Sequence, residues 1–140
     1  MMIKLMLLPV LLVALSIQAA HAEEVTLIFN NSLQKGELTS KVLRKVFLGR
    51  YNSSENGYAI SPCYLDNGNV LQALYNVTRK SDQSFRRYWN KRVFSGTGAP
   101  PNVFSNAQQV SQFVANNKGA VCLTLTGRDI PTDAVIMSID

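Results

Sequence analysis

Histidine is nearly absent from this chain, since the only one, His21, precedes the first predicted strand. The sequence also has no Gly-x-Ser-x-Gly motif and no cysteines at metal-binding spacing, and its acidic residues are scattered. Histidine is the commonest general base and the commonest metal ligand in proteins. We therefore expect no catalytic residues, no enzyme activity, no metal site and no cofactor.

Long apolar runs are also missing, except for one at the N-terminus. It follows Lys4, extends from Leu5 to Ile17, and precedes the small-residue segment Ala20-His21-Ala22. This order is typical of a secretory signal peptide, and the run is shorter than the about 20 apolar residues of a membrane-spanning helix. We expect cleavage after Ala22 and a periplasmic mature protein that does not span a membrane.

The remaining residues, 23–140, suffice for one domain with a modest core and are too few for two. Cleavage of residues 1–22 removes His21, so the mature protein has no histidine. It also removes Lys4, and the formal net charge of +5 falls to about +4.

Apolar and polar patterns alternate between strand and helix periods through the mature chain. The expected strands are 25–29, 58–63, 120–125 and 134–139. The expected helices follow Thr39, the turn 66–69, Ser81 and a capping box at Ser105 and Gln108. This alternation predicts an α/β fold with a mainly parallel sheet and helices on both faces. Ligands bind such sheets beyond the carboxyl ends of the strands, here Asn30–Ser32, Tyr64–Asn69 and the loop after Leu125.

Three segments, in order, resemble small substrate-binding-like proteins of phosphate ABC transporters. Thr39–Arg50 is similar to their helix ending in Phe-x-Gly-Lys/Arg, and Val114–Val121 to their Val-x-x-x-x-Gly-x-Ile-Gly-Tyr ending. Tyr88-Trp89 with Val93–Pro101 resembles their Tyr-Trp…Phe-x-Gly-x-Gly-x-x-Pro stretch. The resemblance implies one lobe of a type 2 periplasmic binding fold. A single lobe leaves its ligand face open to water, so we expect weak binding at most.

The resemblance also implies a candidate ligand site at the turn Asn67-Gly68-Asn69. When the turns are aligned on Gly68, Cys63 and Leu65 stand where phosphate-binding relatives have an arginine and an aspartate. Asn67 and Asn69 then stand at the serine and threonine positions. Backbone N–H groups at a helix start attract anions. Two interpretations stay open, weak binding of phosphate or another oxyanion and an ordinary helix cap.

A second candidate site is the loop Asn30-Asn31-Ser32, directly after the first predicted strand. The equivalent loop contributes ligand contacts in the wider fold that the resemblance implies. Asparagine and serine are also the usual residues of tight turns. Both roles stay open for these three residues.

Positive charge is concentrated between residues 79 and 92, where six basic residues accompany one acid, Asp82. The basic residues are Arg79, Lys80, Arg86, Arg87, Lys91 and Arg92. Such a patch can bind an acidic envelope protein, an importer subunit, an anionic lipid or another polyanion, whereas nucleic acid is not expected outside the cell. The alternative is a solvated face whose arginine stems cover Tyr88 and Trp89. The second functional hypothesis is thus an interaction module that keeps the fold without binding a ligand and docks through this helix.

Cys63 and Cys122 are the only cysteines, and an oxidising compartment favours their pairing. The resemblance places the first strand between the two strands that carry them, which would separate the strands by about 9–10 Å. A disulfide requires Cα atoms within about 7 Å. The oxidising compartment favours a disulfide and the predicted strand spacing opposes it, so a disulfide and two free thiols both stay open.

Overall fold

The structure, a computed structural model, describes residues 24–127, 130 and 135–138. The predicted signal peptide lies outside this part of the chain. The strands are β1 (Val25–Phe29), β2 (Ser61–Leu65), β3 (Asn102–Phe104), β4 (Ala120–Leu125) and β5 (Val135–Ser138). The α-helices are α1 (Ser40–Phe47), α2 (Gly68–Thr78), α3 (Asp82–Phe94) and α4 (Ala107–Asn116), and a 3-10 turn, η1 (Lys35–Glu37), precedes α1. No helix within the described residues is long and apolar enough to cross a membrane.

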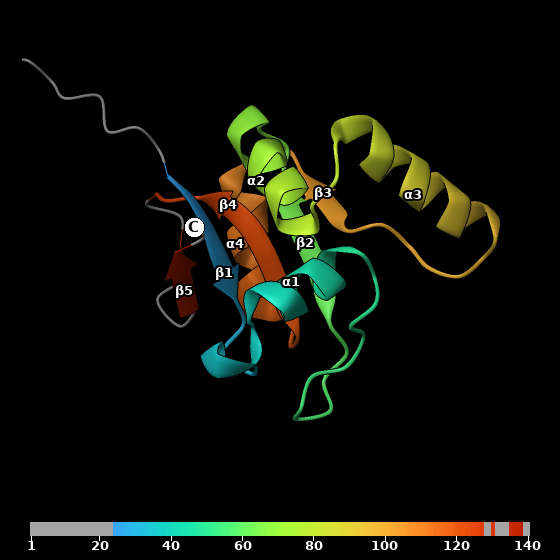
Figure 1. Ribbon diagram of the computed structural model, residues 1–140. Coiled ribbons are helices and arrows are strands. Elements are labelled where there is room, and N and C mark those ends of the chain that lie inside the picture. The colour runs from blue at the N-terminus through green and yellow to red at the C-terminus, as the bar shows by residue number, and fades with distance from the viewer. Residues whose placement is uncertain (1–23, 128–129, 131–134, 139–140) are drawn as a thin grey trace, which may run out of the picture.

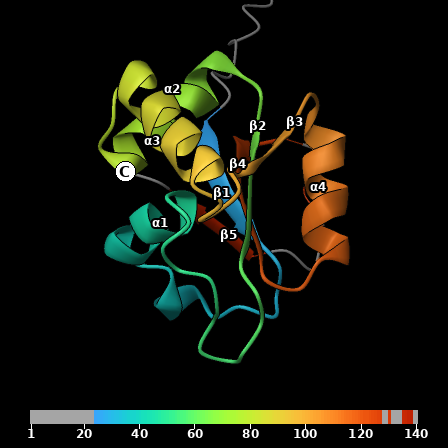
Figure 2. The same ribbon diagram turned by 90° about the vertical axis from the view of Figure 1, so that its right-hand side faces the viewer.

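The strands form one sheet in the order β3-β2-β4-β1-β5. β2 is parallel to β3 and β4, whereas β1 is antiparallel to both of its neighbours, β4 and β5. Four strands therefore point the same way and β1 alone is reversed. Helices α1 and α2 cover one side of the sheet with α3 packed outside them, and α4 covers the other side (Figures 1 and 2). The predicted α/β class, with a mainly parallel sheet between helices, is confirmed.

Helix starts depend on short polar side chains that accept hydrogen bonds from the first free backbone N–H groups. Thr39 caps α1, Ser81 caps α3, and Asn106 caps α4 through its bond from the backbone N–H of Gln109 at 2.9 Å. The predicted cap at Ser105 is therefore wrong by one residue, because the side chain of Ser105 bonds Gln109 instead.

Two strand predictions also need correction. β2 begins at Ser61 rather than at residue 58, and β3, a three-residue edge strand, falls where no strand was expected. The structure places three residues of β3 beside β2, in parallel register from Cys63 to Leu65. Such a short pairing has almost no periodic pattern to reveal it in sequence.

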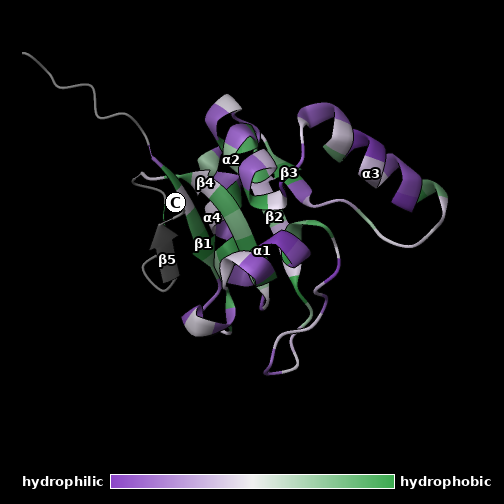
Figure 3. Ribbon diagram, viewed as in Figure 1, coloured by the Kyte–Doolittle hydropathy of each residue, from purple (hydrophilic) through white to green (hydrophobic). Residues whose placement is uncertain are grey.

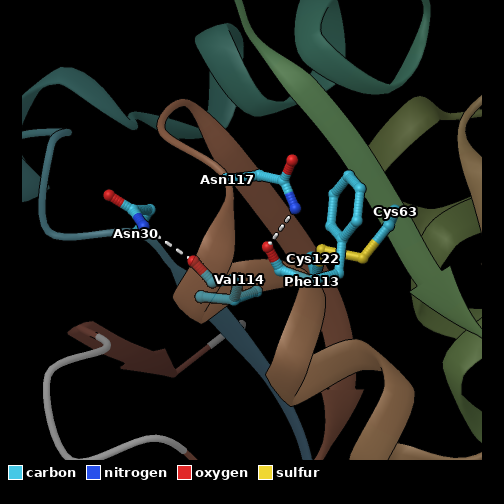
Figure 4. Close-up of a disulfide and its surroundings, with 6 residues drawn as sticks. All are labelled: Asn30, Cys63, Phe113, Val114, Asn117 and Cys122. Carbon is cyan, nitrogen blue, oxygen red and sulfur yellow. Dashed lines mark hydrogen bonds between the residues drawn. A yellow bond between two sulfur atoms is a disulfide. The ribbon is translucent and has the colours of Figure 1, made fainter.

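The strand order also corrects the predicted spacing of the two cysteines. β4, not β1, is the neighbour of β2, and Cys63 lies directly opposite Cys122 in the parallel register. Their Cα atoms are 4.5 Å apart, and the two side chains form a buried disulfide (Figure 4). The predicted separation of the two strands by β1 is wrong, and the bond links two neighbouring strands of the sheet under α4.

Candidate functional site

The two predicted ligand loops lie at opposite ends of the strands of the sheet. Because β1 is antiparallel to β4, Phe29 at its carboxyl end pairs with Val121 near the start of β4. The loop 30–32 therefore meets the turn before β4, whereas the turn 67–69 follows the carboxyl end of β2. The expectation that both loops share one ligand-binding edge is wrong, because an apolar strand pattern does not reveal strand direction.

The side chain of Asn30 holds its own loop together. Its Nδ2 donates a 2.7 Å hydrogen bond to the carbonyl oxygen of Val114 at the end of α4 (Figure 4), and its Oδ1 accepts one from the N–H of Ser32 at 2.9 Å. Ser32 in turn accepts a bond from the N–H of Gly119 through its hydroxyl. Asn31 is exposed. Asn30 and Ser32 therefore have structural contacts that account for their side chains.

The turn before α2 is a capped helix start that remains open to solvent. Asn67 accepts hydrogen bonds from the N–H groups of Asn69 and Val70 through its Oδ1, at 2.9 and 3.3 Å. Gly68 and Asn69 are exposed, and the neighbouring Asp66 is exposed as well. The cap already satisfies two backbone donors, and the Asp66 carboxylate places a negative charge beside the remaining ones.

Two of the three segments that carry the resemblance pack against each other. Gly49, in the left-handed region at φ +68°, lies against the Trp89 ring so closely that a Cβ would be 2.7 Å from ring atom Cη2. Tyr88 donates a 2.5 Å hydrogen bond to the carbonyl oxygen of Leu48. The Phe-Leu-Gly-Arg end of α1 and the Tyr-Trp pair of α3 thus form one contact that attaches α3 to the body. Trp89 is buried and belongs to the hydrophobic core.

Part of the predicted basic patch supports this contact. Lys80 Nζ, Arg50 Cζ and Arg92 Cζ lie 4.9, 5.5 and 5.6 Å from the centre of the Tyr88 ring, within range of cation–π attraction. Arg92 also donates hydrogen bonds to the carbonyl oxygens of Gly49 and Thr97 at 3.4 and 3.0 Å. Lys80 and Arg92 therefore cover aromatic rings of their own chain, as in the alternative to partner binding.

The rest of the patch faces solvent along the outer side of α3. Of the 13 residues in α3, Phe85 and Trp89 are buried, whereas Arg86, Arg87 and Lys91 are exposed. We call these three side chains the basic α3 face. An open depression runs along this helix, lined by Asp82, Gln83, Arg86, Arg87 and Asn90. Arg79, which ends α2 in a left-handed conformation at φ 56°, is exposed nearby in sequence.

Asp82 is the one acid of this helix, and its carboxylate already accepts two hydrogen bonds. It accepts a 3.1 Å bond from Arg86 Nε and a 2.6 Å bond from the Tyr75 hydroxyl. Burial, and then the hydrogen bond to Asp82, raise the pKa of Tyr75 to about 12. Arg86–Asp82 is the only salt bridge within the described residues. Arg87 and Lys91 therefore form no salt bridge with any described acid.

The C-terminal end of α3 changes character from cationic to apolar (Figure 3). Val93 is 53% exposed and Phe94 93% exposed. Helical spacing alone would place Val93 on the buried stripe with Trp89, four residues earlier, but the Val93 side chain is exposed. The far end of α3 projects away from the rest of the molecule (Figure 1), and Val93 lies in its last turn.

One buried carboxylate was not predicted at all. Glu37, at the end of η1, accepts hydrogen bonds from the Tyr51 hydroxyl and the Glu55 N–H. The bond to Glu37, more than burial, raises the pKa of Tyr51 to about 12. The contact closes the loop 50–58 onto η1, far from α3 in sequence. No pattern could have revealed it, because a lone glutamate in a polar segment carries no periodic signal.

The described residues form no metal site, and the sequence comparisons found no match. Within the described residues, no group of three or more His, Cys, Asp or Glu side chains could hold a metal ion. No protein-family model and no curated protein matches the sequence.

Comparison of folds finds a similarity to a solved structure. The structure resembles the crystal structure of an ABC-type phosphate transport receptor from Vibrio cholerae, with a TM-score of 0.52 and 15% identity. The match covers 82% of this chain and 45% of the receptor, so the chain spans less than half of the receptor's length. At this identity the similarity shows the fold alone, which is that of a periplasmic binding protein-like lobe.

Proposed function

We propose that this protein is an exported, periplasmic, non-catalytic relative of solute-binding proteins that docks on an anionic partner through the basic α3 face. One observation carries the proposal: α3 buries two of its 13 residues and presents Arg86, Arg87 and Lys91 to solvent. Concentrated exposed cations attract anionic surfaces over about a Debye length and speed their association. An acidic envelope protein, an importer subunit or another anionic surface fits this chemistry.

The distribution of charge over the fold supports docking on the α3 side. The neighbouring helix α1 has two more exposed cations, Lys41 and Lys45, and no acid. Helix α4, on the other side of the sheet, has no charged residue. The attraction is therefore directional and brings a partner to the α3 side of the molecule.

Heparin, a sulfated polyanion, is a suitable first probe because it requires only accessible cations. We expect Arg87→Glu/Lys91→Glu to elute from a heparin column at clearly lower salt than the wild type. The matched control is Lys35→Glu/Lys118→Glu, which changes the net charge equally at exposed positions outside α3. Equal elution of the two variants would contradict the proposal. Both should keep the wild-type stability within about 0.5 kcal/mol, because exposed charges contribute little to folding.

A second candidate function is weak binding of phosphate or another oxyanion at Asn67, Gly68 and Asn69. The exposed backbone at the start of α2 and the fold shared with a phosphate transport receptor favour it. Against it stand the self-satisfied cap and the exposed Asp66. We expect a dissociation constant of roughly micromolar or weaker, because one open lobe cannot enclose the ion. Calorimetry with phosphate, sulfate and molybdate tests this function, and Asn69→Asp should abolish any heat of binding.

Export is tested separately from binding. The protein isolated from a periplasmic fraction should begin at Glu23. A chain that begins at Met1 and stays in the membrane fraction would contradict the predicted signal peptide.

A further inference from the structure

Resting on the proposed docking function, we propose that the partner of the basic α3 face is an anionic phospholipid surface, which Phe94 enters as an apolar anchor. The observation that points to lipid is the exposure of Phe94, 93%, next to Val93 at 53%. At this exposure the Phe94 side chain occupies no pocket formed by the described residues. Peripheral membrane proteins combine such apolar side chains with nearby lysine and arginine.

The cations and the anchor lie along one side of the helix. Arg87, Lys91 and Phe94 follow one another at spacings of four and three residues, which places them on one stripe of an α-helix. All three are exposed. When the end of α3 meets a bilayer, the phenyl ring reaches the acyl boundary while the two cations, one and two turns back, lie at the level of the phosphates.

The segment that follows the helix suits the polar–apolar boundary. Val93–Pro100, which we call the α3 tip, has no charged residue and is exposed throughout. Its entry into the headgroup region would therefore remove no ionic group from water. An apolar, uncharged tip flanked by cations matches the pattern of an interfacial membrane anchor.

Three backbone N–H groups of the α3 tip are already hydrogen-bonded within the chain. The N–H groups of Ser95, Gly96 and Thr97 donate to the carbonyl oxygens of Lys91, Val93 and Arg92, at 3.1, 3.1 and 3.0 Å. Arg92 donates in turn to the carbonyl oxygen of Thr97. Backbone groups without partners are costly near hydrocarbon. Because these three donors already have partners within the chain, moving them toward the bilayer leaves none of the three unpaired.

Vesicle sedimentation tests the inference with the full mature protein. We expect it to bind vesicles of equal parts phosphatidylglycerol and phosphatidylcholine at low ionic strength, and to bind pure phosphatidylcholine vesicles much less. Phe94→Ser should lower the partition coefficient about tenfold, because a partly buried phenyl ring is lost. Arg87→Gln/Lys91→Gln should lower it about 30-fold, at about fivefold per cation. Val103→Ser, at a 51% exposed apolar position on β3, is the matched control and should leave it unchanged.

Insertion of the tip has its own spectroscopic readout. Phe94→Trp should show a blue-shifted emission on binding phosphatidylglycerol vesicles, and brominated lipids should quench it. In the wild type, Trp89 is buried in the protein and should report neither change.

The outcomes separate this inference from the proposed function. Binding to heparin through Arg87 and Lys91 without binding to phosphatidylglycerol vesicles would overturn the lipid partner, point to an acidic protein, and leave the docking function standing. Failure to bind either probe would overturn both. Vesicle binding that is lost with the cations but unchanged in Phe94→Ser would overturn the anchor.

Discussion

The contact between α1 and α3 can be tested at Gly49. Its φ of +68° lies in the left-handed region, and a Cβ there would be 2.7 Å from Trp89 Cη2. Gly49→Ala should therefore carry two costs. The left-handed backbone costs about 1–2 kcal/mol for a non-glycine residue, and forcing the ring from its position costs about 1–3 kcal/mol. We expect a total loss of about 2–5 kcal/mol in the free energy of unfolding.

Gly96 provides an internal control for the second cost. It has the same φ, +68°, and a Cβ there would meet no atom within 4 Å. Gly96→Ala should lose only the backbone cost of about 1–2 kcal/mol. Urea unfolding, followed by Trp89 fluorescence and by circular dichroism, measures both variants. Equal losses for the two would show that Trp89 does not pack on Gly49, and would refute the account of how α3 is attached.

Three further predictions concern the rest of the fold. Replacing Cys63 and Cys122 by alanine should lower the unfolding free energy by about 4 kcal/mol in the chain-entropy model, and thiol titration of the unfolded, unreduced protein should find no free thiol. Asn30→Ala should cost about 1–3 kcal/mol by leaving buried backbone groups unpaired, whereas Asn31→Ala should be near neutral in the same denaturation assay, and equal effects would contradict the structural role. The pKa of Tyr75 is raised from its ordinary value of 10.0 to about 12 in the folded protein, so the neutral phenol stabilises the fold below pH 10, and this contribution disappears as the pH rises through 12. The stability difference between wild type and Tyr75→Phe should therefore narrow over that range, and a constant difference would argue against the shift.

Local features of the fold were predictable from the sequence, and long-range ones were not. Thr39 and Ser81 cap helices as predicted, because a cap and an apolar stripe are encoded within a few neighbouring residues. The direction of β1 was not predictable, because all but the first of its residues are buried and an apolar run has no polarity. The neighbour of β2 was not predictable either, because β2 pairs with β4, a strand far from it in the sequence. That pairing decides whether Cys63 meets Cys122.

The functional surface was predictable in part. The positive charge of residues 79–92 was evident in the sequence, but the sequence did not show which of the cations pack on Tyr88 and which stay exposed. Lys80 and Arg92 contact Tyr88, whereas Arg87 and Lys91 remain exposed. Helical periodicity cannot tell where a helix extends past its support. For that reason the exposure of Val93 and Phe94 came from the structure alone.

The central claim is that an anionic partner meets the outer side of α3 rather than the turn before α2. Backbone amide chemical shifts of the ¹⁵N-labelled mature protein, titrated with a short heparin oligosaccharide and separately with phosphate, test it most directly. The account predicts that the oligosaccharide shifts the amides of Arg86, Arg87, Lys91 and Phe94 with saturation, and leaves those of Asn67–Asn69 unchanged. Saturable shifts centred on Asn67–Asn69, with α3 unaffected in both titrations, would contradict it.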